Sequence, residues 1–138
     1  MIQLILHGIG DFFIQTDKWA LNKKKKGLYG FWCCLIHCIT YSLPFLFIGS
    51  IDAVLVIFIT HLIIDRTNLI AYLIAIKNNV RSVDKIGFWG MAAIKYKKYD
   101  ISNFGFSKER PFAITIWLYI ICDNLCHIIC NYLALKYL

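Results

Sequence analysis

Each of the four histidines in this 138-residue chain lies four residues from an aspartate or a tyrosine, within an apolar stretch. Residues i and i+4 of a helix lie on one face, about one turn apart. If each stretch is helical, it therefore directs an imidazole and an oxygen ligand to the same side. The four pairs are His7/Asp11, His37/Tyr41, His61/Asp65 and Asp123/His127.

The composition favours a membrane protein. Hydrophobic residues make up 59% of the chain, and the mean hydropathy is +0.63, so a soluble domain of this size would expose large apolar patches. The net charge is +7, and the basic residues gather beside the apolar stretches, in residues 18–26 and 77–110. Basic residues that flank apolar spans are typical of cytoplasmic loops. We therefore expect membrane lipid as a partner, and no nucleic acid.

The apolar pattern predicts an all-α fold, a four-segment transmembrane helical bundle in a single integral membrane domain, residues 1–138. Pro44 interrupts the second segment, and Gly49–Ser50 makes a tight turn before the third. In the long basic stretch, residues 86–99 fit either an interfacial amphipathic helix or an ordinary loop with aromatic anchors. The four segments are expected at about residues 2–19, 28–48, 51–76 and 111–135.

The distribution of lysine and arginine predicts the topology. The basic loops 17–27 and 77–110 are expected in the cytoplasm, and the turn at 48–52 on the outer side, so both termini lie outside. At a helical rise of about 1.5 Å per residue, all four polar pairs then lie near the bilayer midplane. We therefore expect one shared site inside the membrane.

Buried carboxylates in a membrane need a partner. One Asp at the centre of a membrane helix costs roughly 2.5–3.5 kcal/mol on insertion scales. Three such Asp beside four His therefore indicate a shared cation. Imidazole and carboxylate together favour a divalent metal such as Zn, Mn or Fe. The expected metal ligands are His7, Asp11, His61, Asp65, Asp123 and His127.

These ligands outnumber what one tetrahedral ion requires, so the site fits two metals, or one metal with supporting residues and a general base. A metal site could activate water for ester or phosphoester cleavage, and a site at the midplane favours a lipid substrate that enters laterally. Asp65 is then essential, His37 or an unligated Asp serves as base, and Tyr41 donates a hydrogen bond to the ligand or the developing oxyanion.

Other functions remain open from the residues alone. Intramembrane Asp and His also form proton or ion paths, and His–Asp pairs can be packing hydrogen bonds of a structural or effector bundle. Haem ligation by two histidines would leave the three Asp unexplained. The six cysteines are interpreted as small packing residues, with a thiolate metal site as the alternative. A homo-oligomer or a larger membrane complex is expected, because four helices bury little.

The motifs resemble a family of small uncharacterised bacterial and phage multipass membrane proteins. Its members open with H-x-x-x-D-F-x-x-Q, carry H-x-x-x-Y and H-x-x-x-D segments, and end with D-x-x-x-H. This chain has Asp123–Asn124 where the family often has Asp-Gln. The resemblance implies a multipass protein of the bacterial inner membrane. More distantly, the chain is similar to membrane-bound proteins described as predicted metal-dependent hydrolases. The matching residues here are His7/Asp11/Phe12/Gln15, His37/Tyr41, His61/Asp65 and Asp123/His127.

Overall fold

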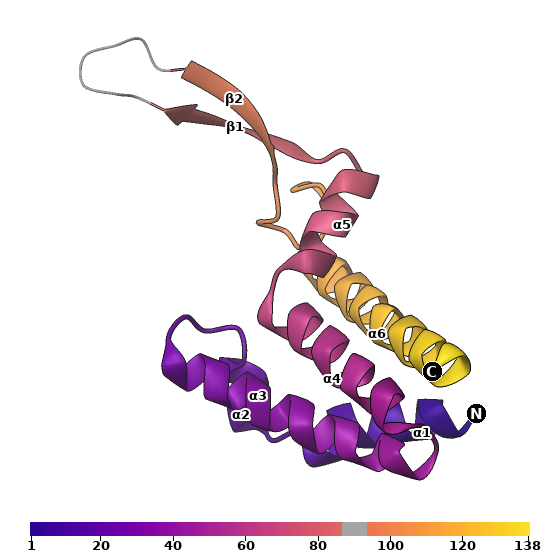
Figure 1. Ribbon diagram of the computed structural model, residues 1–138. Helices are drawn as coiled ribbons and strands as arrows, with labels where there is room; N and C mark the ends of the chain where they lie inside the picture. The colour runs from indigo at the N-terminus through magenta and orange to yellow at the C-terminus, as the bar shows by residue number, and fades with distance from the viewer. Residues whose placement is uncertain (87–93) are drawn as a thin grey trace. The chain divides into compact units, whose positions relative to one another are not determined.

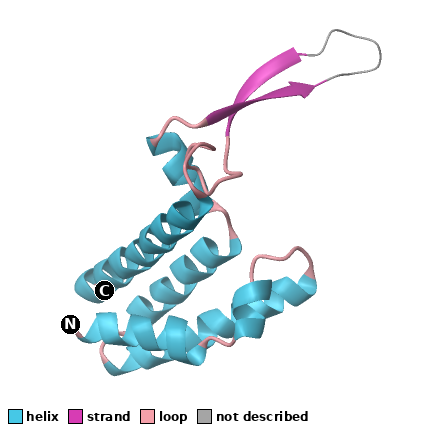
Figure 2. Ribbon diagram, turned by 180° about the vertical axis from the view of Figure 1, so that it is seen from behind, coloured by secondary structure: helices cyan, strands magenta, loops and turns pink. Residues whose placement is uncertain are grey.

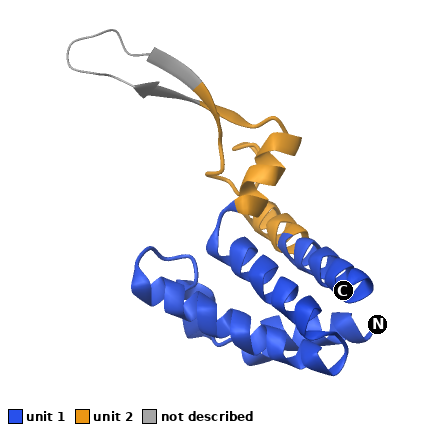
Figure 3. Cartoon of the chain, viewed as in Figure 1, with its two compact units in different colours: residues 1–68, 123–138 blue, residues 69–122 orange. Residues whose placement is uncertain are grey.

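The computed structural model describes the backbone of residues 1–86 and 94–138. It describes the side chains of these residues except those of 83–86 and 94–96. Most of the described chain is helical (Figures 1 and 2). It forms two compact units: unit 1 comprises Met1–Asn68 with Asp123–Leu138, and unit 2 comprises Leu69–Cys122 (Figure 3). The last helix, α6 (Phe112–Tyr137), contributes residues to both units.

The N-terminal segment of unit 1 is not one helix, as predicted, but three short ones. They are α1 (Ile2–Gly8), the π-helix η1 (Ile9–Ile14) and α2 (Asp17–Asn22). The break lies at Gln15 and Thr16, which have extended backbone. The Thr16 hydroxyl accepts a hydrogen bond from the Trp19 N–H at 3.3 Å and so begins a new helix. The prediction was wrong because this N-cap signal was overlooked.

The second segment agrees with the prediction of an interrupted helix. The α-helix α3 (Leu28–Ser42) passes into the 3₁₀-helix η2 (Leu43–Phe47) at Pro44. Proline lacks an N–H and cannot continue the i to i−4 hydrogen bonds. The next helix, α4 (Ile51–Arg66), follows after a short turn in which the Ser50 hydroxyl accepts from the Ala53 N–H at 3.1 Å. Helices α3 and α4 therefore pack as neighbours, as the tight turn predicted.

The third segment is shorter than predicted. It was expected to run to residue 76, but α4 ends at Arg66, and a separate helix, α5 (Leu69–Lys77), follows in unit 2. Thr67 has extended backbone, and its hydroxyl donates to the Ile63 carbonyl at 2.7 Å. Threonine competes in this way with the helical hydrogen bonds. The polar run at 65–68, which the prediction placed in the interior of one long helix, thus marks a helix end.

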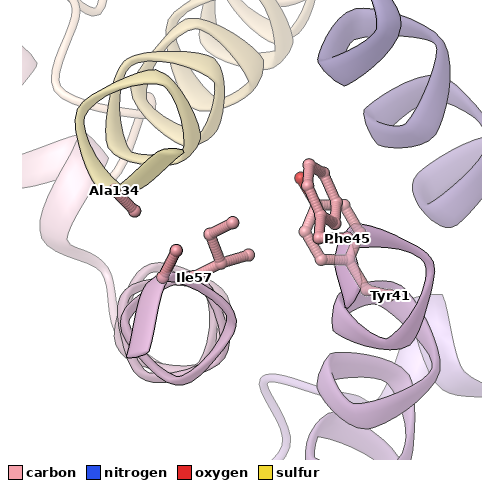
Figure 4. Packing of buried hydrophobic residues seen from close by; sticks show 5 residues of the cluster. Tyr41, Phe45, Ile57 and Ala134 are labelled. Carbon is pink, nitrogen blue, oxygen red and sulfur yellow. The ribbon is translucent and has the colours of Figure 1, made fainter. Parts of the chain in front are cut away.

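The core of unit 1 lies between α3, α4 and the unit 1 part of α6. Figure 4 shows the ring of Tyr41, on α3, close to the ring of Phe45, on η2, with Ile57 beside Ala134. These four side chains are buried, and Ala53 completes the cluster. In a membrane such packing stabilises through dispersion contacts, because lipid is as apolar as the side chains.

Unit 2 contains an antiparallel hairpin. Strand β1 (Arg81–Ile86) pairs with β2 (Ile94–Tyr99), with Arg81 opposite Tyr99. The prediction of an interfacial helix at 86–99 is therefore wrong for Ile86 and for residues 94–99, which are in strands. Residues 87–93 lie outside the described chain. The sequence Ile94-Lys-Tyr-Lys97 alternates with period 2, which favours a strand over a helix.

One glycine determines how the loop after β2 packs in unit 2. Gly105 has φ +81°, which favours glycine, and a Cβ there would overlap the Ala71 carbonyl of α5. The following helix, α6, begins after Pro111, as the sequence predicted.

Two described helical segments are long and apolar enough to cross a membrane, Leu28–Phe47 and Phe112–Tyr137. The consecutive helices α4 and α5 would make a third if they count as one span, and Ile2–Ile14 is a shorter apolar segment. Large apolar side chains are exposed along the helices, among them Phe13, Ile51 and Trp117. These features indicate a membrane protein, while the four-segment bundle stays a prediction.

Candidate metal centre

Four helical elements bring the polar pairs of unit 1 together. Asp11 lies on η1, His37 on α3, His61 and Asp65 on α4, and His127 on α6. The three histidines and Asp65 are each at most 2% exposed, and the Asp11 side chain is 14% exposed. The i, i+4 spacing places His61 and Asp65 on one face of α4, which turns toward the other elements. The structure thus brings Asp11, His61, Asp65 and His127 of the predicted ligand set close together, with His37 among them.

Four ligand atoms form the centre of this cluster, named here the His–Asp cluster: Asp11 Oδ1, His37 Nε2, His61 Nε2 and Asp65 Oδ2. The two imidazole nitrogens are 3.0 Å apart. Asp11 Oδ1 lies 3.2 Å from His37 Nε2 and 3.6 Å from His61 Nε2. Asp65 Oδ2 lies 3.3 Å from each of the same nitrogens.

These distances match the edges of a metal coordination polyhedron. A tetrahedral zinc with bonds of 2.0–2.1 Å has edges of about 3.3–3.4 Å between its ligand atoms. The five contacts of 3.0–3.6 Å are close to this value, and they join each of the two carboxylates to both imidazole nitrogens. Asp11, His37 and His61 form one group that can hold a metal, and His61, Asp65 and His127 form another.

His127 extends the His–Asp cluster on the side of Asp65. Its Nε2 lies 3.6 Å from Asp65 Oδ1 and 3.7 Å from Asp123 Oδ2. The His127 ring stacks on the His61 ring with centroids 4.0 Å apart. Asp123 is more peripheral, since its side chain is 20% exposed and it belongs to neither group.

His7 is close to the cluster but has both ring nitrogens occupied. The Asn131 amide donates a hydrogen bond to the Tyr41 hydroxyl oxygen at 2.7 Å. The Tyr41 hydroxyl can then donate its own proton to His7 Nδ1, also at 2.7 Å. His7 Nε2 must then carry a proton and donate to Asn124 Oδ1 at 3.0 Å. This directed chain orients His7, whose Nδ1 is 3.4 Å from Asp11 Oδ2.

Tyr41 connects this chain to the cluster. It is fully buried, and its ring lies against the His61 ring with centroids 3.7 Å apart. Because its hydroxyl proton is directed to His7, it is not free to donate to a developing oxyanion. The geometry therefore favours a positioning role for Tyr41.

Lys23 is a member of the site that the sequence analysis missed. Its Nζ lies 2.7 Å from Asp65 Oδ2, and Arg66 donates to the carbonyls of Lys23 and Lys25 at 3.0 and 2.7 Å. Burial alone would lower the pKa of Lys23, but the Asp65 carboxylate outweighs it and raises that pKa above its usual value. Within a run of four lysines, nothing in the sequence distinguishes the one that turns inward.

Several buried atoms of the cluster have no hydrogen-bond partner among the described residues. Asp11 Oδ1, for example, lies 3.2 Å from His37 Nε2 but accepts no hydrogen bond from it. Buried polar groups without partners are costly, and a cation would satisfy the oxygens. The atoms are Oδ1 of Asp11, Asp65 and Asp123, and Nδ1 of His37 and His61.

The formal charge also suits a divalent cation. With neutral imidazoles, three carboxylates (Asp11, Asp65, Asp123) against the ammonium of Lys23 leave a charge of −2. An uncompensated charge in a membrane interior is strongly unfavourable. One divalent ion would neutralise it, so the donor set and its charge both fit a metal.

The comparisons with known proteins assign a family. A family model described as "Protein of unknown function (DUF3307)" matches residues 1–136, so the chain belongs to this family. No curated protein and no solved structure matches the chain. The match covers nearly the whole chain.

Proposed function

We propose that this member of the DUF3307 family binds a divalent transition metal in the membrane and hydrolyses a lipid or lipid-linked phosphoester. The observation that carries the proposal is the set of five contacts of 3.0–3.6 Å between Asp11, His37, His61 and Asp65. Mixed imidazole and carboxylate ligands favour Zn, Mn or Fe. Such an ion polarises a water molecule and a substrate oxygen.

The proposal assigns roles that differ in part from those expected from sequence. His37 becomes a ligand, because its Nε2 is within 3.3 Å of three other ligand atoms. His127 completes the ligand set beside Asp65. Asp123 becomes the general base, because it is the most exposed of the three carboxylates at the site and belongs to neither metal-capable group. His7 is held beside Asp11 by Tyr41 and Asn124 and is not assigned as a ligand.

The apolar surroundings of the site support a lipid substrate. Its ligands lie on apolar helices whose outer faces carry exposed large side chains such as Ile39 and Ile63. An acyl or polyprenyl chain could approach through such faces. Lys24 and Lys25, exposed next to Lys23, would attract a phosphate headgroup.

A proton or ion path is the second candidate. Hydrogen bonds connect His37 with His61, and Asn131, Tyr41 and His7 with one another. Such connected groups can relay protons. This function needs no metal, and it predicts a pH-dependent proton or ion flux when the protein is placed in liposomes.

The test is hydrolysis by protein purified in detergent and loaded with zinc. Mixed micelles of phosphatidylglycerol, or of a polyprenyl diphosphate, serve as substrates, and products are followed by mass spectrometry. We expect turnover that a chelator abolishes and that Asp65→Asn also abolishes. Asp123→Asn should keep the metal and lose roughly 100-fold in rate, as removal of a general base does.

Asp52→Asn is the matched control, because Asp52 is exposed in the first turn of the same helix, α4. It should keep full activity. Metal-free protein that retains its whole activity would overturn the hydrolase proposal. Metal-independent proton flux that Asp65→Asn abolishes would favour the ion path instead.

A further inference from the structure

Two cysteines lie beside the His–Asp cluster. Cys34 and Cys38 are one turn apart on α3, both are fully buried, and their Sγ atoms are 3.9 Å apart. A disulfide requires sulfurs about 2.05 Å apart, so both are free thiols. The Sγ atoms and a carboxylate oxygen of Asp65 all lie within 4.8 Å of one another.

The sulfur separation matches a thiolate metal site. With Zn–S bonds of about 2.3 Å, the tetrahedral edge between two sulfurs is about 3.8 Å. The 3.9 Å between Cys34 and Cys38 is therefore close to the separation that two ligands of one ion would have. Thiols that only fill a core have no need of a carboxylate nearby.

We propose that Cys34, Cys38 and Asp65 form a second metal half-site that binds a thiophilic divalent ion such as zinc. This inference deepens the proposed function and rests on it for the role of Asp65 as a ligand. Thiolate ligands select zinc and other soft ions over magnesium and calcium. The half-site thus indicates zinc among the metals that the His–Asp cluster alone would accept.

The binding step balances in charge and protons. Each S–H bond breaks as an S–metal bond forms, two protons leave to solvent, and two thiolates offset the charge of the ion. Asp65 also belongs to the group with His61 and His127, so its carboxylate would be shared by two ions. Two-metal hydrolytic sites have ions about 3.5–4 Å apart, which a shared carboxylate permits.

The neighbouring cysteine supplies a contrast. Cys33 is also buried on α3, at 5% exposed, but it is in none of the metal-capable groups found in the described part of the chain. Cys126 and Cys130 repeat the four-residue spacing on α6, and they are not in those groups either. Burial and spacing alone therefore do not make the half-site, whereas proximity to Asp65 does.

The test is titration of the detergent-purified, reduced, metal-free full chain with Co²⁺, followed by absorption spectroscopy. Sulfur-to-cobalt charge transfer in the near ultraviolet reports thiolate ligation, and visible d–d bands report binding at the His–Asp cluster as well. We expect the charge-transfer band in the wild type. Cys34→Ala with Cys38→Ala should abolish it and lower the bound cobalt by about one ion per chain, while Cys33→Ala leaves both unchanged.

The readouts separate this inference from the proposed function. A wild type that shows d–d bands without charge transfer would overturn the half-site and leave the His–Asp cluster intact. A charge-transfer band that survives the double variant would also overturn it, since other cysteines then bind. Conversely, His61→Ala with His127→Ala should lower the d–d intensity and keep the sulfur band. A wild-type chain that binds cobalt only through sulfur would contradict the proposed function.

Discussion

The ion pair of Lys23 with Asp65 determines how the buried carboxylates are tolerated before a metal binds. The ammonium lies 2.7 Å from Asp65 Oδ2, on the same oxygen that faces His37 and His61. Removing one partner of a buried pair leaves an uncompensated charge. A bound cation and Lys23 thus stabilise the same carboxylate, and each should reduce the need for the other.

We predict that Lys23→Met destabilises metal-free protein by about 3 kcal/mol, the lower end of the range for breaking a buried pair, because Lys23 is 17% exposed. Saturating zinc should reduce this loss. Thermal unfolding in detergent, with and without zinc, measures both effects. Lys26→Met, in the exposed part of the same loop, is the control and should change little. A loss of equal size in both conditions would show that Lys23 and the metal do not share Asp65.

Tyr41→Phe tests the directed hydrogen-bond chain. The substitution leaves His7 Nδ1 and the Asn131 amide without their partner, which costs roughly 1–3 kcal/mol for a buried group. We expect a lower unfolding temperature with the metal content unchanged, because Tyr41 positions His7 and is no ligand. Tyr132→Phe, at a half-exposed position on α6, should be neutral. Loss of metal in Tyr41→Phe would instead make Tyr41 part of the metal site.

Site residues that share one face of a helix could be predicted from the sequence more readily than site residues that come from loops. His61 and Asp65 were predictable because a helix fixes the direction of positions i and i+4. Lys23 was not, because its direction depends on the turn after α2 and on the two carbonyls that Arg66 binds. Cys34 and Cys38 also follow helical spacing, but only the packing of α3 beside α4 brings them to Asp65.

At the level of elements, η1 brings Asp11 to the site through a close contact. This π-helix packs against α3, and a Cβ on its Gly10 would overlap the Tyr41 ring. Short π-helical stretches are frequent at functional sites. The glycine permits close approach, as small residues do between membrane helices.

We therefore predict that Gly10→Ala destabilises the protein by about 1–3 kcal/mol, as overpacking does, and weakens zinc binding through Asp11. Gly8→Ala is the matched control, two residues earlier, where a Cβ would meet nothing within 4 Å. It should be neutral or slightly stabilising. Unfolding and zinc titration of both variants provide the measurement. Equal behaviour of the two variants would exclude a close contact between η1 and Tyr41.

Helix ends and the hairpin were the elements that apolar periodicity missed. Thr16 and Thr67 mark a start and an end through local hydrogen bonds, and each stands in a run of four polar residues, 15–18 and 65–68. Pro44, in contrast, was predictable because its chemistry forbids a continuous helix. The strand at 94–99 was hidden because lysines and aromatic residues also suit an interfacial helix.

For the whole molecule, the distribution of basic residues predicts the orientation in the membrane. The loop with Lys24 is expected in the cytoplasm, and the turn with Ser50 outside. In a bacterial inner membrane, Ser50→Cys should react with a membrane-impermeant maleimide from the periplasmic side, and Lys24→Cys only after the inner face is exposed. Wild-type protein, with its own cysteines, sets the background. Labelling of both positions from one side would contradict this topology.

The most direct measurement of the central claim is the metal content of the purified chain. Elemental analysis of protein in detergent should find about one zinc, manganese or iron per chain or more, because the charge and the donor set suit such an ion. The double variant Asp65→Asn with His127→Ala should lose it, while Asp52→Asn retains it. A wild type that remains folded but binds no divalent metal, even after incubation with each of the three ions, would contradict a shared metal site in the membrane.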